Sequence, residues 1–155
     1  MPSIRPIFLG AVVASCAFTG IAQAQDAPSK GEQALKYRKS LYQVVAWNFG
    51  PMAAMAQGKV PYDAKEFSLR AERVAAVTPM LAEAYPPESQ GVANSRLKPA
   101  MWSERADFDA KLKTLVERSS ALAATAKSGD FAQSKAAFFD TAGACKSCHE
   151  KYRTD

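Results

Sequence analysis

Apolar side chains recur along this chain with the 3.6-residue period of amphipathic helices. No stretch shows the sustained alternation of apolar and polar residues that is typical of strands, so we predict an all-α fold. Four helices are expected, running from about Gly31 to Gln57, from an N-cap at Asp63 to Pro86, from Ser103 and Glu104 to Ser128, and from about Phe131 to Arg153.

Prolines and glycines mark the ends and weak points of these helices. Because proline removes a backbone hydrogen bond, a kink or local break is expected at Gly50 and Pro51, and the second helix should weaken around Pro79. Gly129 is suited to the C-terminus of the third helix, and Asp130 to the N-cap of the fourth. Such short joints place successive helices antiparallel, which predicts an up-down-up-down four-helix bundle.

The first predicted helix has an apolar face that spans an arc of about 100°. Arg38 and Tyr42 share this face with Leu35, Leu41 and Val45. Other large apolar residues are expected to fill the core without a further role. These are the phenylalanines together with Trp47, Trp102, Met52, Met55, Met80 and Met101.

The first 24 residues have the composition of a secretory signal. Arg5 precedes an apolar stretch from Ile7 to about Ile21, and Ala22-Gln23-Ala24 is a small-x-small cleavage site. Cleavage there leaves residues 25–155, the length of one compact domain, and predicts a periplasmic location. The alternative is cleavage at Cys16, because Val13-Ala14-Ser15-Cys16 has the form of a lipoprotein box.

The chain of 155 residues has a formal net charge of +5 at pH 7. Its lysines and arginines are interspersed with acidic residues, which indicates solvated helix faces and no nucleic-acid surface. No segment after the signal approaches the ~20 apolar residues of a membrane span. Charge therefore leaves only a weak preference for an acidic redox partner.

The segment Cys145-Lys146-Ser147-Cys148-His149 has the Cys-x-x-Cys-His spacing of c-type haem attachment. Two thiols at this spacing add across the two vinyl groups of one haem, and the adjacent imidazole reaches the iron. In a helix, Cys145, Cys148 and His149 face one way, and Arg153 falls beside His149. We predict one haem c, bound covalently through two thioethers.

Two other uses of Cys-x-x-Cys were weighed against haem attachment. A zinc site needs four ligands, but His149 is the only histidine and no second Cys/His pair exists after the signal. A dithiol oxidoreductase would carry the motif near a βαβ unit, and no strand pattern is present. A single histidine also excludes bis-histidine ligation within one chain, so the sixth iron position is left to methionine, lysine, tyrosine, water or nothing.

The mature sequence resembles the cytochrome c′ family of class II c-type cytochromes over essentially its whole length. The residues that carry this resemblance are Lys36-Tyr37-Arg38, Trp47-Asn48-Phe49-Gly50, Gly58 to Asp63, Lys98-Pro99, Trp102-Ser103, Lys127 to Asp130, and Cys145 to Arg153. The resemblance implies a four-helix bundle, usually a homodimer through the first two helices, with one five-coordinate, high-spin haem. It also implies an apolar face over the iron that admits nitric oxide or carbon monoxide but excludes most other ligands.

The resemblance assigns roles to two residues of the first helix. Tyr42 aligns with the methionine ligand of low-spin relatives, and should lie over the vacant iron face without binding the iron. Arg38 resembles the arginine near a haem propionate, although an exposed helix cation is the alternative. We expect a non-enzymatic protein that transfers electrons to a redox partner and binds diatomic gases. The alternatives are a six-coordinate electron carrier with Met52 or Met55 as ligand, and a dithiol oxidoreductase.

Overall fold

The computed structural model describes residues 27–154. The predicted signal, including Cys16, and the C-terminal Asp155 lie outside this range. The four long helices are α1 (Lys30–Ala56), α2 (Ala64–Val77), α4 (Arg105–Ala126) and α5 (Phe131–Tyr152). Between α2 and α4 lie the 3₁₀ helices η1 (Thr78–Ala84) and η2 (Pro87–Ser89) and the short helix α3 (Ala100–Ser103).

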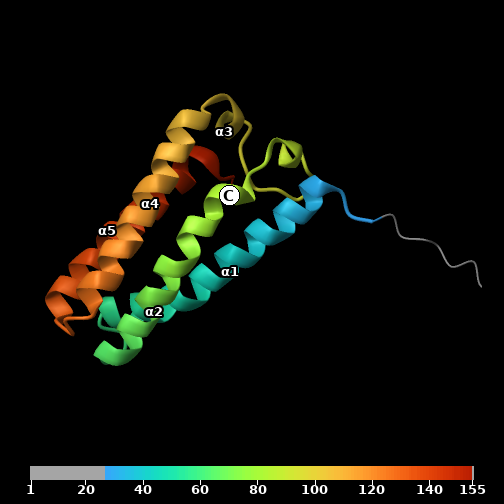
Figure 1. Ribbon diagram of the computed structural model, residues 1–155. Coiled ribbons are helices and arrows are strands. Elements are labelled where there is room, and N and C mark those ends of the chain that lie inside the picture. The colour runs from blue at the N-terminus through green and yellow to red at the C-terminus, as the bar shows by residue number, and fades with distance from the viewer. Residues whose placement is uncertain (1–26, 155) are drawn as a thin grey trace, which may run out of the picture.

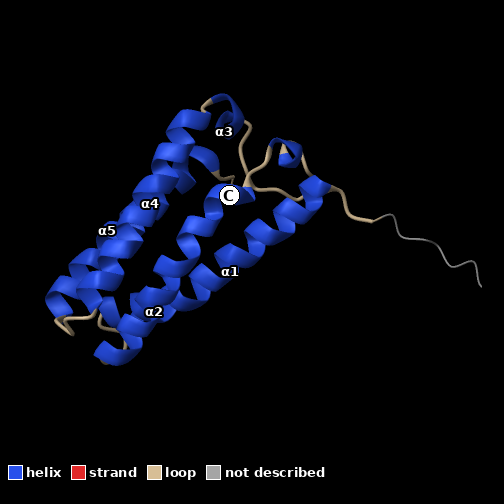
Figure 2. Ribbon diagram, in the orientation of Figure 1, coloured by secondary structure: helices blue, strands red, loops and turns tan. Residues whose placement is uncertain are grey.

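The long helices form an antiparallel four-helix bundle (Figure 1). α1 packs on α2, α2 on α4, α4 on α5, and α5 on α1, which closes a ring of four helices around the core. Within residues 27–154 the regular structure is entirely helical (Figure 2). The predicted all-α, up-down-up-down architecture is confirmed.

Side chains at the helix N-termini satisfy backbone groups that lack an intrahelical partner. The Asp63 carboxylate accepts the Glu66 N–H at 2.9 Å, and the Asp130 carboxylate accepts the Gln133 N–H at 2.8 Å. Gly129 has φ +75°, the left-handed conformation that glycine adopts without strain. These three predicted helix ends are confirmed, and so is the weakening around Pro79, where α2 gives way to η1.

The third predicted helix begins differently from the expectation. A separate short helix, α3, ends at Ser103, and Glu104 is the N-cap residue of α4 without a side-chain capping bond. The Ser103 hydroxyl donates back to the carbonyl of Ala100 instead of capping α4. The Glu104 carboxylate is used elsewhere, in an ion pair with Lys151 of α5.

The predicted break at Gly50 and Pro51 is wrong, because α1 continues through both residues. Proline at position 51 deprives the Trp47 carbonyl of its usual helical donor. The Arg70 guanidinium of α2 takes that place and donates to the Trp47 carbonyl at 3.0 Å. Glu66 holds the same guanidinium at 2.6 Å. A donor from the neighbouring helix therefore compensates the proline.

The core consists of two clusters along the bundle. We call the first the far-end cluster; its buried members are Met52, Met55, Ala56, Phe67, Ala71, Val74, Leu122, Ala123, Ala126 and Phe138. We call the second the motif-end cluster; its buried members are Leu41, Leu81, Ala84, Tyr85, Met101, Phe108, Leu112, Leu115 and Tyr152. Cys145 and Cys148 pack against the motif-end cluster.

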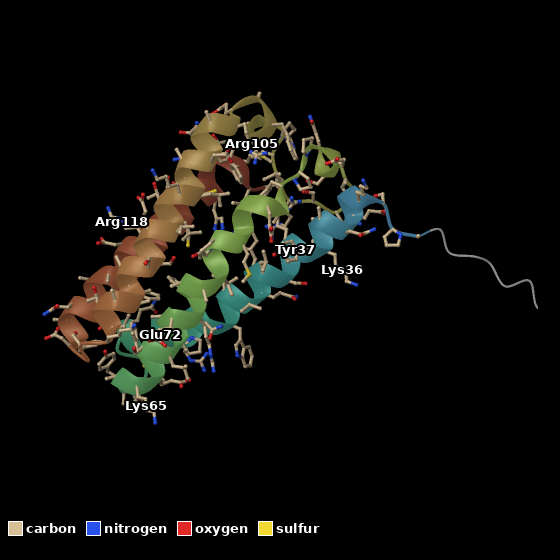
Figure 3. The ribbon with its side chains drawn as sticks, in the orientation of Figure 1. Lys36, Tyr37, Lys65, Glu72, Arg105 and Arg118 are labelled. Carbon is tan, nitrogen blue, oxygen red and sulfur yellow. The ribbon has the colours of Figure 1, made fainter. Side chains whose placement is uncertain are left out.

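Several residues predicted as core lie on the surface. Trp47 is 75% exposed and Met80 is 45% exposed, while Phe131 and Phe139 are also exposed. Their helices bury other faces, since α1 contributes Met52 and Met55 to the core. Charged side chains cover much of the remaining surface, and Figure 3 labels Lys36, Lys65, Glu72 and Arg118 among them. Across residues 27–154, every helix is too short or too polar to cross a membrane.

We predict that Arg70 and Pro51 are energetically coupled. Arg70→Met should lower the free energy of unfolding by about 1 kcal/mol, because the Trp47 carbonyl loses its hydrogen-bond donor. In a Pro51→Ala background the new backbone N–H supplies that donor, so the same change should cost only what the Arg70–Glu66 pair, four residues apart on α2, contributes, about 0.3–0.5 kcal/mol. Urea unfolding of the four proteins measures the coupling, and equal costs in both backgrounds would contradict it.

Candidate functional site: the Cys-x-x-Cys-His end of the bundle

The last two turns of α5 carry Cys145, Cys148 and His149. Both cysteines are free thiols and are partly buried. Burial raises the pKa of both thiols, and the proximity of the two groups adds to this at Cys145. Burial, and then the charge of Arg153, lower the pKa of the His149 imidazole. The imidazole is therefore held in its neutral form, the form that binds a metal.

A segment of the loop before α3 is hydrogen-bonded to the end of α5. The Lys98 N–H donates to the Tyr152 carbonyl at 2.8 Å, and the Lys98 ammonium donates to the Glu150 carbonyl at 3.1 Å. The Thr154 N–H donates to the Arg96 carbonyl at 2.8 Å. The two Lys98 bonds satisfy carbonyls that the end of α5 leaves without partners, and all three bonds hold the motif in place.

Arg153 lies just past the helix that was predicted to include it. Its backbone is extended, with φ −112° and ψ 135°, and α5 ends at Tyr152. The side chain is exposed but close enough to His149 for its charge to lower the imidazole pKa. The charge of Arg153 therefore reaches His149, although the helix from whose periodicity its position was predicted ends one residue earlier.

A cluster of charged groups joins α5 to the start of α4. The Lys151 ammonium lies 2.6 Å from the Glu104 carboxylate and 3.0 Å from that of Asp107. The buried Tyr152 side chain donates its hydroxyl to Asp107. This hydrogen bond, followed by the Lys151 contact, lowers the pKa of Asp107. Sequence analysis did not identify this anchor, because its residues lie in separate helices.

Arg38 is a buried cation that lacks an anionic partner within residues 27–154. Its guanidinium donates to the Ala84 carbonyl and to the Ser95 hydroxyl, both at 3.2 Å, and lies over the Tyr85 ring at 4.7 Å from the centroid. Arg38 is 6% exposed, and burial lowers its pKa. The alternative of an exposed helix cation is therefore wrong. A buried charge of this kind is stabilised by an anion.

Tyr42 packs on the motif-end cluster beside the two thiols. Its hydroxyl lies 2.8 Å from the hydroxyl of Tyr85, a residue that sequence analysis missed. The spacing of Leu81 and Tyr85, one helical turn apart, is the signal that could have indicated a buried residue there. Ser95, the other partner of Arg38, lies in a loop without any periodic pattern.

Met52 and Met55 belong to the far-end cluster and are almost fully buried there. The Met55 sulfur accepts the Asp63 N–H at 3.5 Å, at the start of α2. The thiols pack against the other cluster, with Met101 as its buried methionine. Neither Met52 nor Met55 is therefore placed to bind an iron held at the motif.

The residues at this end of the bundle fit a haem by the chemistry of their donor set. Two free thiols and a neutral imidazole supply the two attachment points and one iron ligand. Apolar side chains of the motif-end cluster suit the porphyrin faces. The unpaired guanidinium of Arg38 suits a propionate, which forms strong charge-assisted hydrogen bonds with arginine. When bound, the haem supplies the redox-active, ligand-binding iron.

An antiparallel helical bundle with Cys-x-x-Cys-His at the end of its last helix defines the class of helical c-type haem proteins. The sequence model of the family Cytochrome C′ matches residues 33–153. The chain belongs to the cytochrome c′ family, which confirms the predicted family and implies a haem c.

Individual relatives agree with this assignment. Cytochrome c′ of Rubrivivax gelatinosus is 40% identical over 124 residues, which cover 80% of this chain and 96% of the relative. The structure of cytochrome c prime from Shewanella frigidimarina is 36% identical, with a TM-score of 0.78, and the match covers 83% of this chain and 100% of that one. A nitric oxide complex of a cytochrome c prime variant from Alcaligenes xylosoxidans is 32% identical, with a TM-score of 0.75 and the same two coverages.

We predict that the anchor formed by Asp107 stabilises the fold only above acidic pH. Since its pKa is lowered in the folded state, its contribution is present above the ordinary carboxyl pKa and is lost as the pH falls through the folded value. Asp107→Asn should therefore lower the free energy of unfolding at pH 7 and have little effect near pH 2. Urea unfolding at both values measures this, and a cost independent of pH would contradict it.

Proposed function

We propose that this chain is a haem c protein with five-coordinate, high-spin iron that transfers electrons and binds diatomic gases. Cys145 and Cys148 hold the haem through thioethers, and His149 is the single protein ligand of the iron. Arg38 and Arg153 orient the haem edge by their positive charge. The distribution of side chains between the two clusters carries the proposal, because Tyr42 of α1 packs against the same cluster as the thiols whereas Met52 and Met55 belong to the other cluster.

Tyr42 supports a vacant sixth position because its phenol is a poor iron ligand. Burial raises the pKa of Tyr42 to about 12, so the hydroxyl keeps its proton at neutral pH. A neutral phenol binds ferrous iron weakly. The six-coordinate carrier with a methionine from α1 is disfavoured by the location of Met52 and Met55.

The thiols support covalent attachment over dithiol catalysis. Catalytic cysteines have lowered pKa values, because the thiolate is the nucleophile. Burial raises the pKa of both Cys145 and Cys148, which disfavours the thiolate. We therefore interpret the protein as an electron carrier and gas binder without turnover of an organic substrate. The nitric oxide complex named for the Alcaligenes xylosoxidans relative supports gas binding.

We predict that the ferrous holoprotein has a high-spin optical spectrum that changes when carbon monoxide is added. Met52→Leu and Met55→Leu should leave both spectra unchanged, since these side chains lie in the far-end cluster. His149→Ala should abolish the native spectrum. A low-spin ferrous spectrum that becomes high-spin in either methionine variant would contradict the proposal and establish the six-coordinate alternative.

The proposed location is the periplasm, with removal of residues 1–24. The attachment motif supports it, because haem c forms where an exported apoprotein meets haem. Mass spectrometry of the protein isolated from the periplasm distinguishes the two cleavage sites, since cleavage before Cys16 retains nine additional residues, 16–24, and adds a lipid. The same measurement reports whether one haem remains attached after denaturation.

We further propose a homodimer that forms through α1 and α2. Large apolar residues are exposed on these helices and on η1, which follows α2. They are Tyr37, Val44, Trp47, Leu69 and Met80. Val44 and Trp47 share one face of α1 because three residues separate them. Exposed aromatic residues of this kind are typical centres of protein interfaces.

We predict that Trp47→Glu converts the dimer to a monomer, because a charge in the apolar centre of an interface is costly to bury. Phe139→Glu is the matched control, since Phe139 is an exposed aromatic on α5, outside the proposed interface. Sedimentation equilibrium of the holoproteins measures the mass. A wild-type monomer, or a Trp47→Glu variant that remains dimeric, would contradict the proposed interface.

A further inference from the structure

Tyr42 and Tyr85 form a hydrogen-bonded pair of phenols at the motif end of the bundle. Their hydroxyl oxygens are 2.8 Å apart, with Tyr42 on α1 and Tyr85 directly after η1. Tyr85 is 4% exposed and is a member of the cluster against which Tyr42, Cys145 and Cys148 pack. The two phenols therefore lie in the same apolar surroundings as the attachment thiols.

One hydrogen of this pair has no acceptor among residues 27–154. Each phenol carries one hydroxyl hydrogen, and the contact between the two oxygens uses only one of them. Neither hydroxyl makes another hydrogen bond to this part of the chain. Because buried donors are nearly always paired, the second hydrogen marks a place for an acceptor that the polypeptide does not supply.

The placement of the two phenols determines which hydrogen is available to an added acceptor. Tyr85 is 4% exposed and enclosed by the motif-end cluster, whereas Tyr42 is only partly buried at the edge of that cluster. With an acceptor bound beside Tyr42, both hydrogens are paired only if Tyr85 donates to the Tyr42 oxygen and Tyr42 donates to the acceptor.

We infer that Tyr42 donates a hydrogen bond to ligands bound at the haem iron, and that Tyr85 is the positioning residue that aims this hydroxyl. The inference rests on the proposed function, since it requires a haem with an open iron position. It departs from the apolar iron face that the family resemblance implies. The pair selects ligands that accept a hydrogen bond, such as anions and polarised diatomic gases, over weak acceptors.

The protonation of the pair is compatible with this role. Burial raises the pKa of Tyr42 to about 12 and raises that of Tyr85 further. Both phenols therefore keep their protons across the neutral range and remain donors. The charged group that faces them is the Arg38 guanidinium, and the two thiols beside Tyr42 are neutral for the reason given above.

The experiment uses the purified holoprotein with two probes, fluoride for the ferric state and carbon monoxide for the ferrous state. Tyr42→Phe removes the donor, and should weaken fluoride binding about tenfold, the ratio for loss of a hydrogen bond to a charged acceptor. The infrared C–O stretch should move to higher frequency, because the donor no longer draws electron density toward the bound oxygen atom.

Tyr85→Phe should keep the Tyr42 hydroxyl as a donor but no longer fix its orientation. We expect a smaller loss of fluoride affinity and a broadened or split C–O band, which a purely structural role would not produce. Tyr62→Phe is the matched control, because the Tyr62 hydroxyl donates to Ser134 at 3.3 Å beside the far-end cluster. Its fluoride affinity and C–O band should equal those of the wild type.

The outcomes separate this inference from the proposed function. If the wild-type ferrous holoprotein does not bind carbon monoxide, both the proposed function and this inference are contradicted. If carbon monoxide binds but the wild-type ferric holoprotein binds no fluoride, or Tyr42→Phe leaves the fluoride affinity and the C–O stretch unchanged, only the hydrogen-bonding role is overturned. A Tyr85→Phe variant with a single sharp band at the wild-type frequency overturns the positioning role of Tyr85.

Discussion

The packing of the last two turns of α5 against the motif-end cluster is the constraint on which the site depends. It buries both thiols and part of the imidazole, and this burial keeps all three groups uncharged. Hydrogen bonds and ion pairs to the loop before α3 and to α4 reinforce this packing. Lys98 holds the helix carbonyls, while Lys151 and Tyr152 join the helix to α4. The motif is thus a rigid part of the bundle.

The two core clusters differ in composition, and only the motif-end cluster contacts the attachment motif. The far-end cluster is made of methionine, alanine, valine, leucine and phenylalanine side chains. The motif-end cluster has the phenols of Tyr85 and Tyr152 within it and Tyr42 against it, with Arg38 above Tyr85. Polar atoms inside an apolar core are costly unless they are paired. The phenols of Tyr42 and Tyr85 meet this requirement by bonding to each other.

Local signals predicted three of the helix ends, because each of these depends on a few neighbouring residues. Asp63 and Asp130 cap the N-termini of their helices, and Gly129 adopts the positive φ that glycine allows. The continuity of α1 through Pro51 could not be predicted in this way, since its compensating donor is on another helix. The attachment motif could also be recognised from adjacent residues, whereas the Tyr42–Tyr85 pair joins residues 43 positions apart. Contacts of that kind arise only from tertiary packing.

The guanidinium of Arg38 has a consequence for how the protein matures. Before any cofactor is present, the chain must remove this cation from water with only neutral groups around it, which weakens the folded state. A ligand that carries a carboxylate, such as a haem propionate, and binds only the folded chain shifts the folding equilibrium toward the folded state. Folding of the chain and binding of the haem are thereby thermodynamically linked, so the chain without haem is the form most exposed to proteases.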